Sequence, residues 1–261
     1  MSNDHALLSV VIPAYNEEQR LPPTLARIQA YLALQPYHAE VLVVDDGSTD
    51  ATASLAEQVD GVRVLRCDHR GKGFAVRTGA LNACGDYILL CDADLAVAID
   101  EWEQLHRALV DGHDVAIGSR ESLGARRLGE PWYRHLMGRV FNFVVQRLAL
   151  QGIQDTQCGF KAMHRDVATD LFHHMHIYGA HAPPVSGPAV TAYDVELLFV
   201  ARRRGYRIIE VPVTWHYGTE TKVDPMRDSL RNVRDVLKVR MNDWRGRYPN
   251  RTRSPVMGKR S

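Results

Sequence analysis

The chain has 261 residues, of which 45% are hydrophobic and 24% charged, and its formal net charge is +1. These values are typical of one globular domain with a substantial core, and the charge gives no reason to expect a nucleic acid partner. No apolar run approaches the roughly 18 to 20 residues of a membrane span, and no signal peptide pattern opens the chain. The four cysteines lack C-x-x-C spacing and fit a reducing cytosol.

The first part of the chain is predicted to repeat a strand–helix unit. Apolar stretches predict strands at residues 8–13, 40–45, 62–67, 86–92 and 114–119. Helical patterns follow at residues 17–34, 51–58, 72–84 and 101–110. Strands that are apolar throughout and alternate with helices predict an α/β fold, in which a mainly parallel sheet is covered by helices on both faces.

The second part is predicted to be mostly helical. Helices are expected at residues 131–150, 165–172, 193–204 and 226–240, with one strand at 207–214. The segment 179–192 is rich in Pro and Gly and is expected to be a loop. Residues 1–240 are therefore predicted to form a single domain, and the basic, Pro-containing residues 241–261 a flexible tail.

Two carboxylates, Asp92 and Asp94, follow the apolar run that ends at Cys91. In an extended segment, residues two apart lie on the same face, so both acids are expected to point the same way. Mg²⁺ is usually bound by one or two carboxylates together with substrate phosphates. The pair therefore indicates a metal-held diphosphate, with a solvated loop turn as the alternative.

Two earlier strands end in similar residues. Asp45 and Asp46 follow one strand, and Tyr15 and Glu17 follow another. Ligands of parallel sheets bind outside the carboxyl ends of the strands. Three acidic strand ends at one edge favour a binding site over chance.

Five segments carry a resemblance to a known family: VVIPAYNEE, VVDDGSTD, GKGFAVRTG, ACGDYILLCDAD and DTQCGFKA. In this order and spacing they resemble the inverting family 2 glycosyltransferases, in particular the branch that uses polyprenyl (dolichyl) phosphate. The resemblance runs from about residue 8 to 238. It implies a GT-A fold, which is a single Rossmann-like domain, and a nucleotide-sugar donor, with UDP-glucose ahead of GDP-mannose. It also implies Mg²⁺ or Mn²⁺ and a polyprenyl phosphate acceptor.

The resemblance also implies site residues. Nucleotide-sugar binding falls to Pro13, Ala14, Tyr15, Glu17, Asp45, Asp46, Lys72, Asp92, Ala93 and Asp94. Metal binding falls to Asp94 first and Asp92 second, and His216 is a further candidate ligand for which a packing role is equally open. Lys72 lies where a helix N-terminus favours an anion, although a plain tight turn would look the same.

Three residues are predicted to act in catalysis, namely Arg120, Asp194 and Lys222. Arg120 is expected to clamp an anion and Lys222 to pair with the diphosphate. Asp194 is expected either to take a proton or to orient a substrate. A phosphate acceptor is already anionic near neutral pH, so it needs no strong base.

Residues 131–150 also carry an apolar stripe with arginines between its members. The stripe predicts either a core-facing helix or an interfacial helix that touches the cytoplasmic face of a membrane. Two other functions stay open: a family 2 enzyme with a hydroxyl acceptor, and a non-catalytic nucleotide-sugar-binding module. A dinucleotide oxidoreductase is excluded because no G-x-G-x-x-G follows the first strand. The sequence predicts no oligomeric state.

Overall fold

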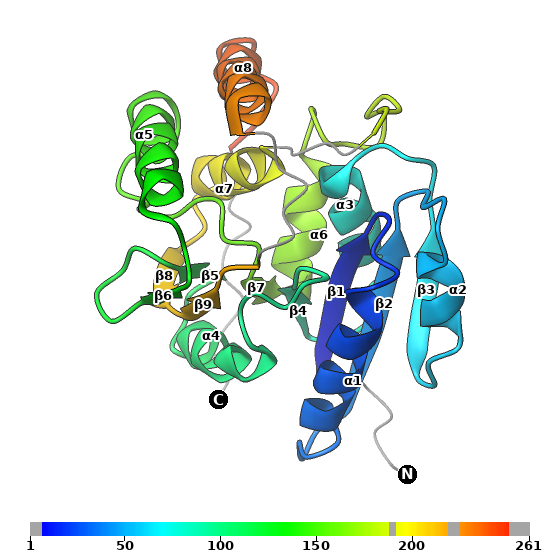
Figure 1. Cartoon of the computed structure of the whole chain (residues 1–261). Coiled ribbons are helices and arrows are strands. Elements are labelled where there is room, and N and C mark those ends of the chain that lie inside the picture. The colour runs from blue at the N-terminus through cyan, green and yellow to red at the C-terminus, as the bar shows by residue number, and fades with distance from the viewer. Residues whose placement is uncertain (1–6, 188–191, 219–224, 251–261) are drawn as a thin grey trace.

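A seven-stranded sheet runs through the middle of the molecule (Figure 1). The computed structural model describes residues 7–187, 192–218 and 225–250. The sheet has the order β3-β2-β1-β4-β7-β5-β8, and only β7 runs antiparallel to its neighbours. The strands are β1 (Leu8–Ala14), β2 (Ala39–Asp45), β3 (Val62–Arg66), β4 (Tyr87–Leu90), β5 (Val115–Ser119), β7 (Lys161–His164) and β8 (Ile208–Pro212).

Helices cover both faces of the sheet because its strands are apolar on both faces. In β1, Val10 and Ile12 contribute to one hydrophobic core, and Val11 contributes to the other. The first core is shared with α1 (Leu21–Leu32), α2 (Thr52–Glu57) and α4 (Trp102–Val110). The second is shared with α3 (Lys72–Asn82), α6 (Arg165–His173) and α7 (Tyr193–Arg203). The predicted α/β fold, with its mainly parallel sheet, is confirmed.

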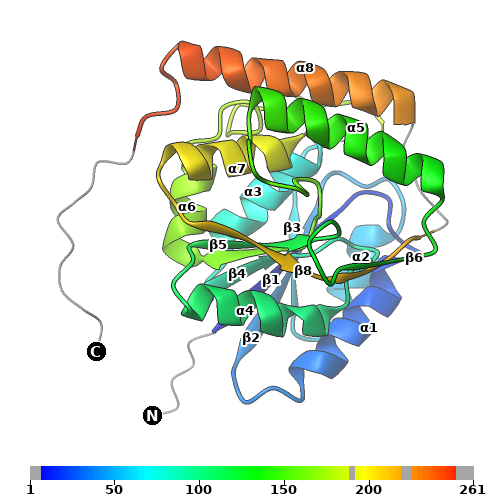
Figure 2. The ribbon, with the colours of Figure 1, turned by 90° about the vertical axis from the view of Figure 1, so that its left-hand side faces the viewer.

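Two long helices form an outer layer. Figure 2 shows α5 (Trp132–Leu148) and α8 (Pro225–Trp244) lying side by side above α7. Only part of each helix is buried, through Val145 of α5 and through Val236 and Val239 of α8. The outer layer therefore leaves much of both helices to solvent.

A second, two-stranded sheet lies beside the edge where the parallel strands end. It pairs β6 (Arg126–Leu128) with β9 (Thr214–His216), and Val97 forms a single bridge to Trp215. A short 3₁₀ helix (Ile99–Glu101) leads into α4. The sequence did not predict β6, β7 or β9, because runs of three or four residues carry too little periodicity.

Several predicted boundaries were wrong. Helix α1 begins at Leu21 rather than residue 17, and prolines follow in its first turn, where a missing N–H costs nothing. Strand β4 ends at Leu90, because Leu95 donates a hydrogen bond to the carbonyl of Asp92 and closes a turn. Helix α8 continues to Trp244, and Tyr248 beyond it is buried. Asn242 and Tyr248 of the predicted tail are therefore buried, residues 251–261 lie outside the described part, and the flexible tail stays a prediction.

Candidate active site

The predicted site residues do gather at one edge of the sheet. Since β1, β2 and β4 are parallel, their carboxyl ends lie on the same side. The N–H of Asp46 donates to the carbonyl of Ala14 at 2.8 Å, and the Thr24 hydroxyl donates to the carbonyl of Ala93 at 2.8 Å. The loops after the three strands are thus joined directly.

Asp46 organises the turn that follows β3. Its carboxylate accepts hydrogen bonds from the backbone N–H groups of Arg70 and Gly71, at 2.9 and 2.8 Å. His69 Nδ1 lies 2.8 Å from the same carboxylate, and the His69 ring stacks on Tyr15 at 3.9 Å between centroids. Burial raises the pKa of Asp46, although these three partners act in the opposite direction.

Residues 13–17 run from the end of β1 toward α1 and contact α2. Pro13 is half-buried and Ala14 is buried at the strand end. The N–H of Glu17 donates to the Thr52 hydroxyl at 2.6 Å, and the Glu17 carboxylate pairs with Arg20 at 2.6 Å. Glu17 lies in the loop before α1, which begins at Leu21.

Asp45 lies beside Ala14, where β2 and β1 end. It is buried at the end of β2, and its carboxylate accepts a hydrogen bond from the N–H of Ser48 at 3.3 Å. It therefore shapes the turn after β2.

Asp92 is held between a lysine and a glycine. Lys72, the first residue of α3, places Nζ 2.6 Å from Asp92 Oδ1. A Cβ atom on Gly159 would lie 2.2 Å from Asp92 Oδ2, so only glycine leaves room for this carboxylate. Burial opposes the negative charge on Asp92, but Lys72 lowers its pKa. Desolvation by the surrounding protein atoms and the charge of Asp92 raise the pKa of Asp94, although its side chain reaches solvent.

Asp94 is exposed and is the freest of the predicted metal ligands. The N–H of Ala96 donates to its carboxylate at 3.1 Å, and the N–H of His216 donates to the carbonyl of Ala96 at 2.8 Å. His216 is itself exposed on β9. The two candidate ligands thus start from backbone segments that are hydrogen-bonded to each other. In the described residues, no three His, Cys, Asp or Glu side chains form a metal cage of their own.

Asp194 takes part in a buried ion pair. The Lys161 ammonium, which is 0% exposed, contacts Asp194 Oδ1 and also donates to the carbonyl of Cys158. Asp194 lies in the first turn of α7, where the helix dipole favours a negative charge. The carboxylate is therefore engaged and fixed in place.

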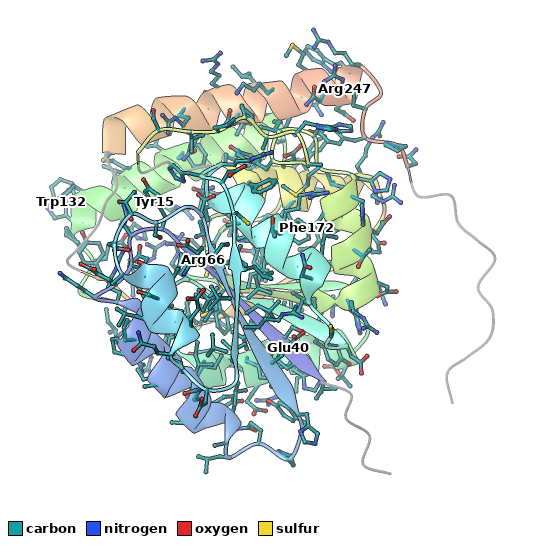
Figure 3. The ribbon with its side chains drawn as sticks, turned by 90° about the vertical axis from the view of Figure 1, so that its right-hand side faces the viewer. Tyr15, Glu40, Arg66, Trp132, Phe172 and Arg247 are labelled. Atoms are coloured by element: carbon teal, nitrogen blue, oxygen red, sulfur yellow. The ribbon has the colours of Figure 1, made fainter. Side chains whose placement is uncertain are left out.

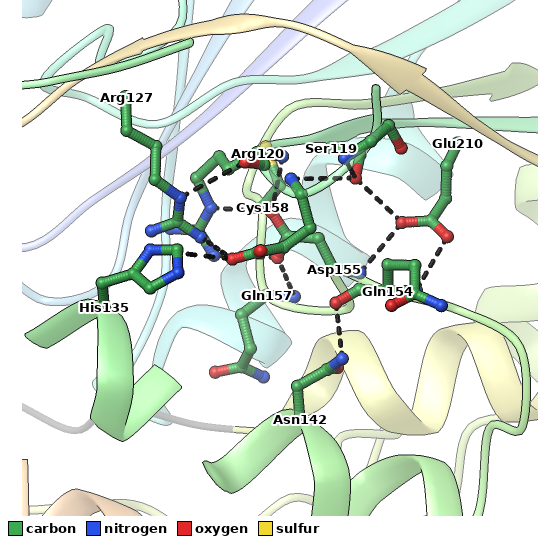
Figure 4. Close-up of polar contacts among 12 residues, drawn as sticks. Ser119, Arg120, Arg127, His135, Asn142, Gln154, Asp155, Gln157, Cys158 and Glu210 are labelled. Carbon is green, nitrogen blue, oxygen red and sulfur yellow. Dashed lines mark hydrogen bonds and ion pairs between the residues drawn. The ribbon is translucent and has the colours of Figure 1, made fainter. Parts of the chain in front are cut away.

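Arg120 is held by Asp155, as Figure 4 shows. The guanidinium donates through Nε and Nη2 to the two carboxylate oxygens at 2.7 and 2.8 Å, and lies 5.3 Å from the Trp215 ring centroid. Burial alone would lower the pKa of Arg120, but Asp155 raises it above its ordinary value. Burial likewise opposes the charge on Asp155, but Arg120 lowers that pKa to about 2. The predicted anion clamp is thus already one half of an ion pair.

Four residues with clear structural roles at the site were not assigned from the sequence: His69, Asp155, Gly159 and Lys161. Three of them belong to the DTQCGFKA segment, which carried part of the resemblance. Each contacts a predicted site residue from a distant part of the chain, which periodicity does not reveal. Lys222 lies outside the described residues, and its role stays a prediction.

The outer layer presents an apolar surface to solvent. On α5, Trp132 is 77% exposed and projects from the end of the helix (Figure 3). Trp244 of α8 is 80% exposed. We call this surface the α5/α8 apolar face, and its exposed members are Trp132, Tyr133, Leu136, Met137, Val140, Phe143, Leu148, Leu237, Met241 and Trp244. The stripe predicted for residues 131–150 is thus largely solvent-facing rather than core-facing. None of the described helices combines the length and apolarity needed to cross a bilayer.

Comparison with known proteins identifies the family. Residues 9–172 match the model of glycosyl transferase family 2. Dolichyl-phosphate beta-glucosyltransferase of Mus musculus is 35% identical over 260 residues, which cover 92% of this chain and 77% of the relative. The protein of the same name from Drosophila melanogaster is 37% identical over 253 residues, covering 89% and 74%.

Solved structures agree on the fold. Glucosyl-3-phosphoglycerate synthase from Mycobacterium tuberculosis, in complex with UDP, superposes with a TM-score of 0.64 at 22% identity, covering 90% of this chain and 80% of that one. Mannosyl-3-phosphoglycerate synthase from Rubrobacter xylanophilus gives 0.65 at 20% identity, covering 97% and 79%. The predicted family and GT-A fold are confirmed. The chain belongs to glycosyl transferase family 2 and is a glycosyltransferase.

Proposed function

We propose that this enzyme transfers glucose from UDP-glucose to a polyprenyl phosphate of the dolichyl type, with inversion at the anomeric carbon. The observation that carries the proposal is the acidic edge, where Lys72, Asp92 and Asp94 meet, in a chain whose relatives are named dolichyl-phosphate beta-glucosyltransferases. GDP-mannose is the second donor to test.

A divalent metal fits the residues at this edge. Asp94 is exposed beside Asp92, whose negative charge contributes to the raised pKa of Asp94, so a cation bound there would relieve the repulsion between the two carboxylates. Mg²⁺ or Mn²⁺ would be held by Asp94 first, with Asp92 or His216 as a second ligand and the donor diphosphate supplying others, and would stabilise the charge of the departing UDP. A structural neighbour was solved with Mn²⁺ and UDP-glucose.

The remaining positive charges serve the same leaving group. Lys72 lies at the N-terminus of α3, where the helix dipole adds to its own charge, and Asp92 fixes its ammonium. Arg120 uses Nε and Nη2 to bind Asp155, and these two hydrogen bonds hold the guanidinium in place. The third nitrogen, Nη1, takes no part in them. We assign Arg120 to the acceptor phosphate or the donor diphosphate, and Lys222 to the diphosphate.

The engaged state of Asp194 favours a phosphate acceptor over a hydroxyl acceptor. A hydroxyl must lose its proton to a base during transfer, whereas a phosphate is already an anionic nucleophile near neutral pH. Asp194 is paired with the buried ammonium of Lys161. In this proposal it positions a substrate and does not take a proton.

The acceptor would be reached from the membrane surface. The α5/α8 apolar face offers tryptophan and aliphatic side chains, and the same two helices carry the exposed arginines Arg139, Arg147, Arg231 and Arg234. Such a face suits the boundary of an anionic bilayer. We therefore place the enzyme as a peripheral protein at a cytoplasmic membrane face.

The test is product analysis with a set of nucleotide sugars, dolichyl phosphate in vesicles, and Mn²⁺ or Mg²⁺. We expect a lipid-linked β-glucoside from UDP-glucose, identified by mass spectrometry and by its anomeric proton. Transfer only to soluble hydroxyl compounds would favour the hydroxyl-acceptor enzyme. Tight binding of UDP-glucose with neither transfer nor hydrolysis would favour the non-catalytic binding module.

A further inference from the structure

His69 connects three parts of the molecule that are far apart in sequence. Its ring stacks on Tyr15 with an interplanar angle of 3°. Its Nδ1 contacts the Asp46 carboxylate at 2.8 Å, and its Nε2 lies 3.0 Å from the carbonyl oxygen of Gly187. One side chain therefore joins the ends of β1 and β2 to the Pro-rich loop.

The Pro-rich loop at residues 179–187 packs on the same turn by further contacts. The N–H of Val185 donates to the carbonyl of His69 at 3.0 Å. Arg70 reaches the carbonyl oxygens of Ala180 and Ala182 at 3.4 and 3.5 Å. The described part of this loop is thus hydrogen-bonded along the turn that carries His69, three residues before Lys72.

The close approach of His69 to the turn after β2 requires a glycine at position 47. Gly47 has φ +75, and a Cβ atom there would lie 2.9 Å from the backbone nitrogen of His69 and 3.1 Å from its Cβ. The N–H groups of Arg70 and Gly71 are committed to Asp46, so the backbone that leads into Lys72 depends on the same carboxylate. Disturbing His69 would release the ring of Tyr15 and one contact of the Asp46 carboxylate, whereas the hydrogen bonds from Arg70 and Gly71 to that carboxylate would stay.

We propose that His69 is a positioning residue of the donor-nucleotide site, and that residues 179–187 form the outer wall of that site through it. Tyr15 and Asp46 lie at the carboxyl edge of the sheet, where the nucleoside is expected to bind, and His69 fixes the ring of one and the carboxylate of the other. The inference rests on the proposed nucleotide-sugar donor. It adds a residue and a loop to which no role was assigned.

The contribution is expected in binding rather than in the chemical step. His69 touches neither Asp92 nor Asp94 in any recorded hydrogen bond or ion pair, so the residues nearest the diphosphate keep their own contacts. A ring stack and one or two hydrogen bonds together correspond to about tenfold in affinity. The KM for the donor should rise by that factor while kcat stays within about twofold.

The experiment measures UDP affinity by calorimetry and donor kinetics for graded variants. His69→Phe keeps a ring for Tyr15 but loses both polar contacts, His69→Asn keeps an amide donor but loses the ring, and His69→Ala loses both. We expect the UDP dissociation constant to rise most for His69→Ala, and less for the other two. His173→Ala, which removes an exposed histidine of α6, is the matched control and should bind like the wild type.

The loop is tested separately by Val185→Pro. Proline removes the N–H that donates to His69 and leaves the His69 side chain in place. We expect weaker UDP binding with unchanged thermal stability. This variant therefore tests the inference even if His69→Ala fails to fold. Wild-type UDP affinity in Val185→Pro and in a folded His69→Phe would overturn the inference. Absence of nucleotide binding in the wild type would instead overturn the proposed function.

Discussion

The sheet edge and the α5/α8 apolar face lie in one domain but are built on opposite principles. At the edge, charged side chains are buried or half-buried and paired, as in Lys161–Asp194, Arg120–Asp155 and Lys72–Asp92. On the outer helices, apolar side chains are exposed, with Trp132 and Trp244 among the most accessible. The edge thus buries charge that is compensated by ion pairs, and the outer helices expose apolar side chains. In the proposed function the edge binds a charged donor and the outer helices contact an apolar phase.

The largest expected effect is on the metal-binding part of the edge. Removal of divalent metal by EDTA should abolish transfer, and Asp94→Asn should lower kcat by roughly 10²–10³ because charge on the departing diphosphate loses its support. Steady-state rates across a Mn²⁺ titration are the measurement.

Asp100→Asn provides the control, since Asp100 is another exposed acid six residues further along the chain and should behave like the wild type. Full activity of the enzyme after exhaustive metal removal would remove the metal from the account.

The buried pair Lys161–Asp194 tests whether buried ion pairs stabilise the sheet edge. Lys161→Met leaves Asp194 buried without its partner, which should lower the free energy of unfolding by about 3–5 kcal/mol. Urea unfolding measures the change. Combining it with Asp194→Leu should recover much of the loss, because both buried charges are then gone.

The exposed pair Arg66–Glu57 is the matched comparison. Glu57→Gln should leave stability nearly unchanged, because solvent screens that pair. Equal effects of Lys161→Met and Glu57→Gln would show that the charges at the edge are not effectively buried.

The apolar face is tested by its tryptophans. Trp132→Ser and Trp244→Ser should each weaken binding to anionic vesicles on the order of tenfold, because each removes a large apolar side chain from the bilayer boundary. Vesicle sedimentation measures the apolar face, and UDP calorimetry measures the sheet edge. The UDP affinity of both variants should equal that of the wild type.

Leu34→Ser changes a side chain that is equally exposed at the end of α1 and should bind vesicles like the wild type. If Leu34→Ser and Trp132→Ser weaken vesicle binding to the same extent, the α5/α8 apolar face has no special role.

The smallest effect concerns acid stability. Arg120 holds the pKa of Asp155 at about 2, below the ordinary 3.8. Because the folded-state pKa is depressed, the stabilisation is complete above about pH 4 and is lost as the pH falls toward 2, by about 2 kcal/mol. Asp155→Asn should abolish this part of the pH dependence in denaturant titrations. Asp60→Asn, at an exposed acid, should keep it, and an unchanged slope in Asp155→Asn would assign the acid sensitivity elsewhere.

The sequence predicted the sheet edge well because its signals are local. Apolar runs that end in acids, such as the run before Asp92, mark buried parallel strands and their carboxyl ends. The contacts that complete the edge are not local: Lys161 reaches Asp194 across 33 residues, and His69 reaches Gly187 across 118. Side-chain packing decides such pairs, and no spacing rule encodes them.

For the outer helices, the sequence predicted the bounds of α5 but not which of its side chains face solvent. The helix at residues 131–150 was predicted nearly to its bounds, α5 being Trp132–Leu148, but its pattern fitted a core-facing and a solvent-facing stripe equally. Only the position of α5 beside α8 and above α7 shows which side chains are covered (Figure 2). Val145 is buried and Val140 is exposed, although both belong to the same predicted stripe.

The most direct test of the account offers the enzyme two acceptors at once. Labelled UDP-glucose and Mn²⁺ would be supplied with dolichyl phosphate in vesicles and with 3-phosphoglycerate, named in structural neighbours, in solution. We predict that the label enters the lipid phase, and that Trp132→Ser slows this transfer without diverting it. Label recovered chiefly as soluble glucosyl-3-phosphoglycerate would contradict the account, because the donor edge would then work without the apolar face.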